Sequence, residues 1–346
     1  MSFSVGIVGL PNVGKSTLFK ALTKQKVDIS NYPFCTISPN SGIVQIPDER
    51  LQKIAEITKP ERITPIVIEF VDIAGLVRNA HKGEGLGNQF LAQIREVDAI
   101  LEVVRDFEDE NIIHIEGKPN PERDIETIKT ELLMKDLEIM EKIRENLKKD
   151  AKSGNKEIIK KLELIEKLYG EISRGKAISE IESKDEQKKI AEELCFLTAK
   201  PTIYVFNVGE ETKKSCSRPE NYIEINLKSE EETSELSDSE KIELEFQSKI
   251  NDLISLCYKI LDLITFYTIK GGVEVRAWTL KRGQTVLEAA GKVHTDFKEK
   301  FIRAEVVNFK KLLGAGGWND AKEKGWIETV GKEYVVNDGD IIEFKI

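Results

Sequence analysis

Histidine and cysteine are scarce in this sequence of 346 residues, which contains three and four of them respectively. The cysteines, Cys35, Cys195, Cys216 and Cys257, lie far apart and form no C-x-x-C pair. With so few histidines to complete a metal site, neither structural zinc nor a disulfide framework is indicated. We therefore expect free thiols.

Long apolar runs are also missing. No window approaches the roughly 18 uncharged apolar residues of a membrane helix, and the sequence does not start with a basic segment followed by an apolar one. The sequence indicates neither a membrane span nor a signal peptide, and it predicts a cytoplasmic protein. With 40% hydrophobic and 33% charged residues, the chain is typical of a globular protein of two or three domains.

The sequence also lacks an excess of basic residues. The net charge of −9 argues against general adhesion to nucleic acid, and we expect no DNA partner. Charge is uneven, however, because residues 265–346 contain 14 Lys and Arg against 12 Asp and Glu, which leaves −11 on the remainder. Any contact with RNA is therefore expected to favour the C-terminal end.

What the sequence does contain is a phosphate-binding loop. A G-x-x-x-x-G-K-[ST] pattern runs from Gly9 to Ser16, between an apolar run at 5–8 and a helical pattern at 17–22. This order points backbone N–H groups and a helix N-terminus at one spot, to which Lys15 adds a charge and Ser16 a hydroxyl ligand for Mg²⁺. The sequence predicts a nucleoside triphosphate site formed by Asn12, Val13, Gly14, Lys15, Ser16 and Thr17.

Two further segments have the pattern of nucleotide-sensing switches. The turn-rich segment 31–37 contains Thr36, which can offer its hydroxyl to Mg²⁺ and its N–H to a γ-phosphate. The apolar run 67–72 ends in a D-x-x-G motif, in which Asp72 holds Mg²⁺ through water and the N–H of Gly75 senses the γ-phosphate.

The residue after Gly75 is unusual for a nucleotide switch. Many GTPases have there a glutamine that orients the attacking water, whereas this chain has Leu76, which cannot polarise water. Hydrolysis is therefore expected to be slow, or to depend on another residue. His114 and His81 are the two candidates for that task, and a structural role for His114 is an equal alternative.

Proline is absent between Pro121 and Pro201, and apolar residues recur there at helical spacing in two runs. A break at 152–155 separates the runs, and Lys and Glu dominate the other faces. The pattern predicts a helical hairpin inserted into the nucleotide domain. We favour a solvated antiparallel coiled coil, with an RNA-binding arm as the alternative.

The base-reading motif of GTPases is altered here. Where N-K-x-D is usual, the strand at 201–206 is followed by Asn207, Val208, Gly209 and Glu210. Guanine loses the lysine and its well-fitted bidentate carboxylate, whereas adenine loses nothing on that edge. The amide of Asn207 can still serve a purine, and the loop at 227–230, after a strand at 222–226, is expected to complete the base pocket.

The last third of the chain reads as a small β-rich module. We expect a strand at 273–278, a helix at 286–293, and a final hairpin in which a turn at 338–339 joins strands at 334–336 and 341–344. No catalytic group of residues is evident in this module.

The chain resembles the YchF subfamily of the Obg-like P-loop NTPases over essentially its whole length. The stretches that carry the resemblance are Gly6 to Thr17, Asn31 to Ile37, Phe70 to Val77, Gly83 to Phe90, Asn111 to His114, Glu274 to Thr279 and Ala289 to Phe297. The last two resemble the TGS domain of that family. Gly209 and the acidic run 228–235 depart from the family pattern, which affects the base contacts rather than the fold.

The resemblance implies an α/β fold. It comprises a P-loop NTPase domain at 1–122 and 199–264, a helical hairpin at 123–198 and a β-grasp TGS domain at 265–346. It also implies ATP preferred over GTP, a role for His114 in hydrolysis, K⁺ coordination by Asn12 beside the Mg²⁺ site, and association with the ribosome. We expect a monomer.

Three functional hypotheses follow. The first is a slow ATPase that uses Lys15 and the loop amides for the phosphates, Ser16, Thr36 and Asp72 for Mg²⁺, and His114 for water. The second is a module whose ATP occupancy gates docking to the ribosome, with hydrolysis incidental. The third is a GTP-preferring switch.

Overall fold

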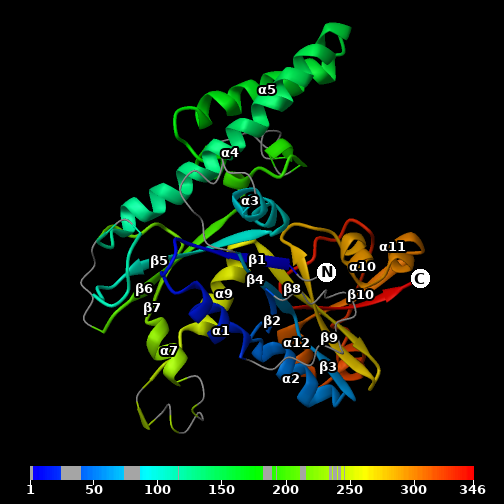
Figure 1. Ribbon diagram of the computed structural model, residues 1–346. Coiled ribbons are helices and arrows are strands. Elements are labelled where there is room, and N and C mark those ends of the chain that lie inside the picture. Colours follow the sequence, from blue (N-terminus) through cyan, green and yellow to red (C-terminus); the bar gives the residue numbers. More distant parts are fainter. Residues whose placement is uncertain are drawn as a thin grey trace.

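The fold is taken from a computed structural model of the chain. It describes residues 3–24, 40–73, 86–115, 117–181, 189–191, 193–210, 216–233 and 246–346, together with 236, 240 and 243–244. Two six-stranded sheets and a projecting pair of helices make up the molecule (Figure 1).

The first sheet has the strand order β2-β4-β1-β5-β6-β7. Its strands are β1 (Phe3–Val8), β2 (Ser41–Gln45), β4 (Val67–Asp72), β5 (Ala99–Asp106), β6 (Thr202–Val208) and β7 (Tyr222–Ile225). Neighbouring strands run parallel except β2, which is antiparallel to β4. Every residue of β5 is buried, because helices cover both faces of a parallel sheet.

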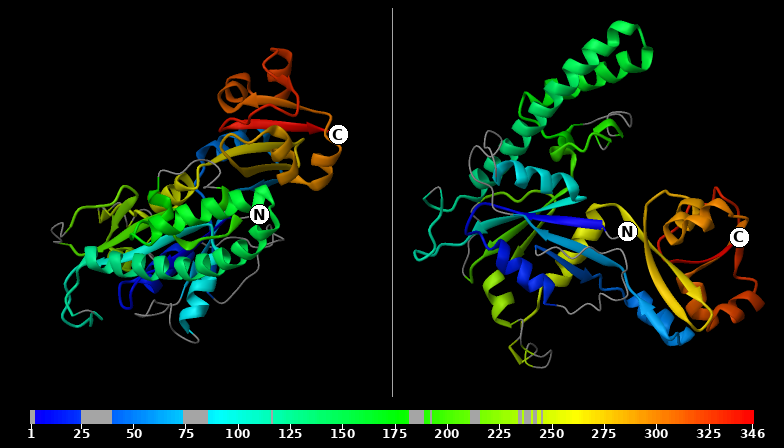
Figure 2. Two further views of the ribbon diagram at one scale, coloured as in Figure 1. Left: turned by 90° about the horizontal axis from the view of Figure 1, so that it is seen from above. Right: turned by 45° about the vertical axis from the view of Figure 1, so that its right-hand side comes forward.

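The helices of this domain are α1 (Lys15–Thr23), α3 (Leu86–Glu96), α7 (Leu227–Thr233) and α9 (Ile250–Ile260). Helix α3 lies over one face of the sheet, and α1 and α9 lie on the other (Figure 1, Figure 2). The expected α/β nucleotide domain is thus confirmed, with the strand, loop and helix in the order read from residues 5–22.

The predicted helical hairpin consists of α4 (Pro121–Asp150) and α5 (Lys156–Ile172), joined by a 3-10 turn at Ala151–Ser153. Pro121 occupies the first turn of α4, where its missing N–H costs nothing, and the side chain of Asn120 caps that end by accepting from the Arg123 N–H at 3.1 Å. Further 3-10 turns lie at Ile178–Glu180 and Leu197–Ala199. Buried Asp136 accepts hydrogen bonds from the N–H groups of Leu197 and Thr198, which fixes α4 to the chain that returns from the hairpin.

The second sheet has the order β11-β10-β12-β8-β9-β3. Its elements are β3 (Arg62–Thr64), β8 (Leu263–Lys270), β9 (Glu274–Lys281), β10 (Arg303–Asn308), β11 (Glu328–Val330) and β12 (Asp340–Lys345), with helices α10 (Val286–Val293), α11 (Thr295–Glu299), α12 (Phe309–Ala315) and α13 (Trp318–Glu323). An antiparallel β8–β9 hairpin, a helix and a final strand parallel to β8 form the expected β-grasp arrangement.

The expected hairpin at the C-terminus is wrong. Residues 334–336 form no strand, and Val335 makes only an isolated bridge to Thr285. The reason is that β12 lies between β10 and β8, so that both of its edges are already occupied.

One strand comes from outside the C-terminal third. The chain leaves the first sheet after β2, forms α2 (Glu49–Thr58) and β3, and returns as β4. Strand β3 pairs in parallel with β9 of the second sheet. The second sheet therefore begins two residues before the expected boundary at 265, with β8 at Leu263, and it includes a strand from residues 62–64.

The described cysteines, Cys195, Cys216 and Cys257, are free thiols. Across the ranges given above, the structure contains no helix that is both long and apolar enough to cross a bilayer.

Candidate functional site

The phosphate loop joins the end of β1 to the start of α1. Gly14 precedes the helix in the left-handed region, with φ 109°, and a Cβ there would lie 2.7 Å from Nδ2 of Asn207. Only glycine fits this position without strain. No side chain caps the helix, so its first N–H groups remain available to a bound anion.

Lys15 is turned back onto the loop itself. Its Nζ donates to the carbonyl oxygens of Gly9 at 3.1 Å and Leu10 at 2.9 Å. Burial lowers the pKa of Lys15, while the nearby charge of Asp72 opposes that change. A polyanion at this position places a full opposite charge beside this poorly solvated ammonium group. The attraction between them favours binding of the polyanion.

Ser16 and Asp72 lie side by side at the ends of α1 and β4. The Ser16 hydroxyl is 3.5 Å from Oδ2 of Asp72. Burial raises the pKa of Asp72, against the opposing effects of Lys15 and Ser16. A hydroxyl and a carboxylate are hard oxygen donors of the kind that Mg²⁺ prefers, so these two residues fit the predicted metal site.

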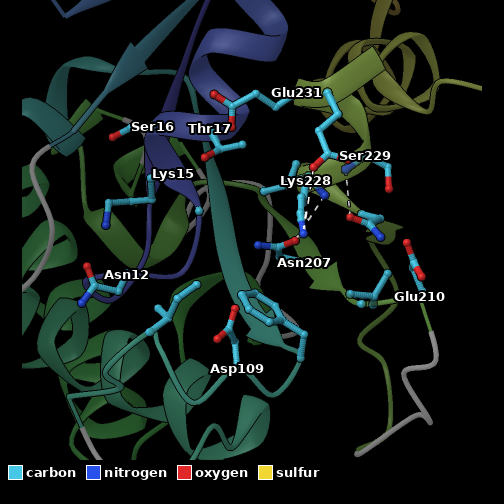
Figure 3. Close-up of a pocket in the computed structure, with 18 residues that line it drawn as sticks. Asn12, Lys15, Ser16, Thr17, Asp109, Asn207, Glu210, Lys228, Ser229 and Glu231 are labelled. Carbon is cyan, nitrogen blue, oxygen red and sulfur yellow. Dashed lines mark hydrogen bonds and ion pairs between the residues drawn. The ribbon is translucent and has the colours of Figure 1, made fainter. Parts of the chain in front are cut away.

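A cavity of about 670 Å³ extends from the phosphate loop across the ends of β5, β6 and β7 (Figure 3). In Figure 3, Asn12, Lys15 and Ser16 lie on one side, Lys228 and Ser229 on the other, and Asn207 between them. The residues that line the cavity are Asn12, Gly14, Lys15, Ser16, Thr17, Phe107, Asp109, Ile112, Asn207, Val208, Gly209, Glu210, Asn226, Leu227, Lys228, Ser229, Glu231 and Glu232.

The altered base motif lies in this cavity. Asn207, however, was expected to contact a purine, and its amide bonds to the protein backbone instead. Its Nδ2 donates to the Val13 carbonyl at 2.9 Å, and its Oδ1 accepts from the Leu227 N–H at 3.2 Å. The buried amide therefore ties the phosphate loop to the start of α7. Val208 and Glu210 lie at the cavity wall, and neither supplies the lysine or aspartate of a guanine-reading motif.

A second wall was not anticipated from the sequence. Phe107, Asp109 and Ile112 line the cavity from the loop after β5. Buried Arg105 holds this loop by donating to the carbonyl oxygens of Phe107, Asp109 and Ile112 at 3.2, 3.1 and 2.9 Å. Its guanidinium also lies over the Phe107 ring, 4.6 Å from the centroid. An arginine near the end of a fully buried strand is the signal that could have identified this wall.

His114 follows the same loop, but the structure does not bring it to the phosphate loop. Its side chain is 2% exposed, and Nε2 lies 2.9 Å from Oδ2 of Asp124 in the first turn of α4. His114 is not among the residues that line the cavity. In this conformation the imidazole is a buried partner of Asp124.

Asn12 connects the phosphate loop to the segment before His114. Its φ is 62°, and its Nδ2 donates to the Ile113 carbonyl at 3.1 Å. The side-chain oxygen of Asn12 is then the atom left to accept a cation, as the K⁺ prediction requires. Thr36, Gly75, Leu76 and His81 lie outside the described residues.

Two family models match the chain. A family model described as "50S ribosome-binding GTPase" matches residues 4–159, and one described as "YchF-GTPase_C: Protein of unknown function (DUF933)" matches residues 263–346. The chain is 46% identical over 364 residues to the "Ribosome-binding ATPase YchF" of Bacillus subtilis (strain 168), covering 100% of this chain and 99% of that protein. It is 45% identical to the protein of the same name from Escherichia coli O157:H7, with 99% of each covered.

A solved structure, that of the Schizosaccharomyces pombe YchF GTPase, is also similar. It superposes with a TM-score of 0.87 at 36% identity, over 99% of this chain and 98% of that one. Both the sequence and the fold similarities extend from one end of the chain to the other.

Proposed function

Because this chain belongs to the YchF family of P-loop NTPases, we propose that it binds ATP, hydrolyses it to ADP and phosphate, and does so in association with the ribosome. The observation that carries the proposal is one cavity that contains both the phosphate loop and a base motif lacking the guanine-reading lysine and aspartate. The names of these relatives supply the ribosome as the partner.

The preference for ATP rests on Val208 and Glu210. Guanine needs a carboxylate placed to accept from two of its donors, and the longer Glu210 side chain, exposed at the cavity wall, does not reproduce that geometry. Adenine has no such donor pair to leave unpaired. Phe107 and the α7 start then enclose the base without reading a guanine edge.

The loop amides and Lys15 bind the phosphates. The Lys15 ammonium group gives up its hydrogen bonds to the loop carbonyls and contacts the β- and γ-phosphates instead. Ser16 and Asp72, with Thr36, would hold Mg²⁺, which neutralises charge on the phosphate oxygens when bound. Gly75 would sense the γ-phosphate. Asn12 would place its side-chain oxygen on K⁺ while its Nδ2 donates to the Ile113 carbonyl.

Water activation is assigned to His114. For this role the imidazole must leave Asp124, because a side chain that is 2% exposed cannot reach bulk water or a γ-phosphate. A neutral imidazole accepts a proton from the attacking water as the bond between the β- and γ-phosphates breaks. The need to break a buried pair before each turnover would make hydrolysis slow.

The same buried pair also favours the second candidate, an ATP-gated ribosome-binding module whose hydrolysis is incidental. Turnover measured with and without ribosomes separates the two. If the protein is an ATPase, ribosomes stimulate its ATP hydrolysis or at least sustain it through repeated cycles. A gated module instead binds ribosomes according to the nucleotide present and hydrolyses little ATP. In either form we propose a cytoplasmic monomer with no membrane or DNA partner.

The test is calorimetry with ADP, ATP, GDP and GTP on the full chain, beside a V208K/E210D variant. A lost pair of hydrogen bonds to a buried base costs about 2–4 kcal/mol, so ATP should bind roughly 30- to 1,000-fold more tightly than GTP. The double substitution should raise GTP affinity and leave ATP affinity nearly unchanged. Lys15→Ala, as control, should abolish binding of all four; equal or tighter binding of GTP by the parent chain would refute the ATP assignment.

A further inference from the structure

The α4–α5 hairpin ends in a turn that lies far from both sheets. Figures 1 and 2 show the two helices extending away from the nucleotide domain, with the turn at their free end. The turn is well defined, because Gly154 takes a left-handed φ of 76° and Asn155 caps α5 by accepting from the Glu157 N–H at 2.9 Å. Side chains at this end therefore have a fixed backbone and face solvent.

The end of the hairpin is basic in an otherwise acidic chain. Residues 144–161 contain seven Lys and Arg against three Asp and Glu, although the whole chain has a net charge of −9. Some of these cations are neutralised nearby: Arg144 and Lys148 approach Glu166 at 3.8 and 3.1 Å, and Lys161 pairs with Glu193 at 2.9 Å.

Three lysines at the turn remain without such a partner. Lys149, Lys152 and Lys156 are exposed, and their side chains make no ion pair or hydrogen bond with any residue that the structure describes. Lys149 lies at the end of α4, Lys152 lies in the 3-10 turn and Lys156 begins α5, so the three are grouped within eight residues at the free end. We call these three residues the lysine tip.

The composition of the tip distinguishes between partners. Protein interfaces are depleted in lysine and enriched in aromatic residues, and residues 144–161 contain no aromatic residue. Ile159, 38% exposed, is the one large apolar side chain there that is substantially exposed. Lysine without apolar or aromatic neighbours is suited to phosphate oxygens, which it contacts without reading bases.

We propose that the lysine tip docks on the phosphate backbone of structured RNA. The hairpin carries this contact away from the nucleotide cavity, so RNA can be bound while the cavity remains open to ATP. The inference deepens the proposed ribosome association, on which it rests, by naming the surface that meets RNA. It also selects the RNA-binding arm among the two hairpin alternatives.

The test uses the full chain with K149Q/K152Q/K156Q and a matched control, K53Q/K59Q/K118Q, whose lysines lie outside both the hairpin and residues 265–346. The control removes the same charge from exposed lysines elsewhere. Binding of each protein to a short RNA hairpin duplex and to purified ribosomes is measured between about 50 and 200 mM salt, a range in which phosphate contacts weaken steeply. Circular dichroism checks that the helices are intact.

The tip variant should bind RNA about 10- to 100-fold more weakly near 0.1 M salt, and its slope of log affinity against log salt should be shallower by about 2–3. The control should match the parent chain. The proposal is overturned if the tip variant binds RNA like the parent, if both variants lose affinity equally, or if the tip lysines prove necessary only for vesicles of anionic phospholipid.

ATP turnover in the absence of RNA is measured on the same three proteins and should be equal in all of them. Absence of turnover in the parent chain would contradict the proposed ATPase while leaving the RNA titrations fully interpretable. The two proposals therefore fail in different measurements.

Discussion

At the scale of single residues, the position of His114 is the most informative feature of the site. The histidine is paired with Asp124 in a buried environment, and the carbonyl of its neighbour Ile113 is bonded to Asn12 of the phosphate loop. The loop that contains His114 is thus connected directly to the phosphate loop.

We expect His114→Ala to lower the rate of ATP hydrolysis by about 10²–10³ while changing ATP affinity little, because a water-orienting group acts only in the chemical step. Single-turnover hydrolysis and calorimetry at saturating Mg²⁺ and K⁺ measure the two quantities. His81→Ala is the matched variant. A parent-like rate for His114→Ala would eliminate the assignment, and a collapse in His81→Ala would transfer the role to that residue.

The variant Asp124→Asn tests whether Asp124 assists catalysis or only holds His114 in its buried position. The buried Asp124 carboxylate also lies 3.2 Å from the guanidinium of Arg123, whose side chain is 37% exposed. If Asp124 only sequesters His114, the asparagine variant should hydrolyse ATP at least as fast as the parent chain. A slower variant would instead show that Asp124 orients the imidazole during turnover.

At the scale of elements, the excursion formed by α2 and β3 connects the two sheets. It leaves from β2, which follows the segment containing Thr36, and returns through β4, which ends at Asp72. The excursion is fixed to the second sheet by polar contacts: Arg62 and Thr64 donate to Glu274, Arg50 pairs with Asp338 at 2.7 Å, and Tyr267 donates to Asp48 at 2.6 Å. The two strands that flank the proposed metal site are therefore joined to the C-terminal sheet through this excursion.

We expect Glu274→Ala to free β3 from β9. The carboxylate, 20% exposed, accepts from Arg62 at 2.6 Å and Thr64 at 2.7 Å, and loss of such bonds costs about 1–2 kcal/mol at a partly exposed site. Hydrogen exchange of the amides at 62–64 should accelerate while that of β5 stays unchanged. Glu328→Ala, which breaks the exposed pair with Lys311, is the control; unchanged exchange at 62–64 would contradict this role for Glu274.

At the scale of the whole molecule, a buried carboxyl group makes stability depend on pH. Glu102 lies within fully buried β5, and its Oε1 has no hydrogen-bond partner in the described part of the chain. Burial raises the pKa of Glu102 well above its usual range, and the charge of Asp124 raises it further. The folded state therefore holds a proton that the unfolded state has released.

The sign of the pH effect follows from this difference. Between the unfolded pKa near 4.3 and the raised folded pKa, the folded state binds more protons, so Glu102 lowers stability by about 1.4 kcal/mol for each pH unit of rise. Glu102→Gln should remove this dependence, so that between about pH 4 and neutral pH the free energy of unfolding falls less in the variant than in the parent chain. Denaturant unfolding of both proteins across that range is the measurement; parallel pH profiles would show that Glu102 is ionised in the fold.

The sequence alone determined the features that contiguous residues encode. The phosphate loop from Gly9 to Ser16, the strand ending at Asp72 and the paired helices at 121–172 each depend on local order or periodicity, so they could be predicted in place. The loss of the guanine-reading motif at Asn207 to Glu210 was equally readable. The roles of Thr36 and Gly75 in the site stay predictions from the sequence.

Only the tertiary structure decided which distant residues meet. Asn207 bonds to Val13, which is 194 residues away, and Thr64 bonds to Glu274, which is 210 residues away. No local pattern records such pairs, because each depends on how separately formed elements pack. For the same reason the burial of His114 against Asp124, the wall held by Arg105 and the entry of β3 into the second sheet became evident only in the folded molecule.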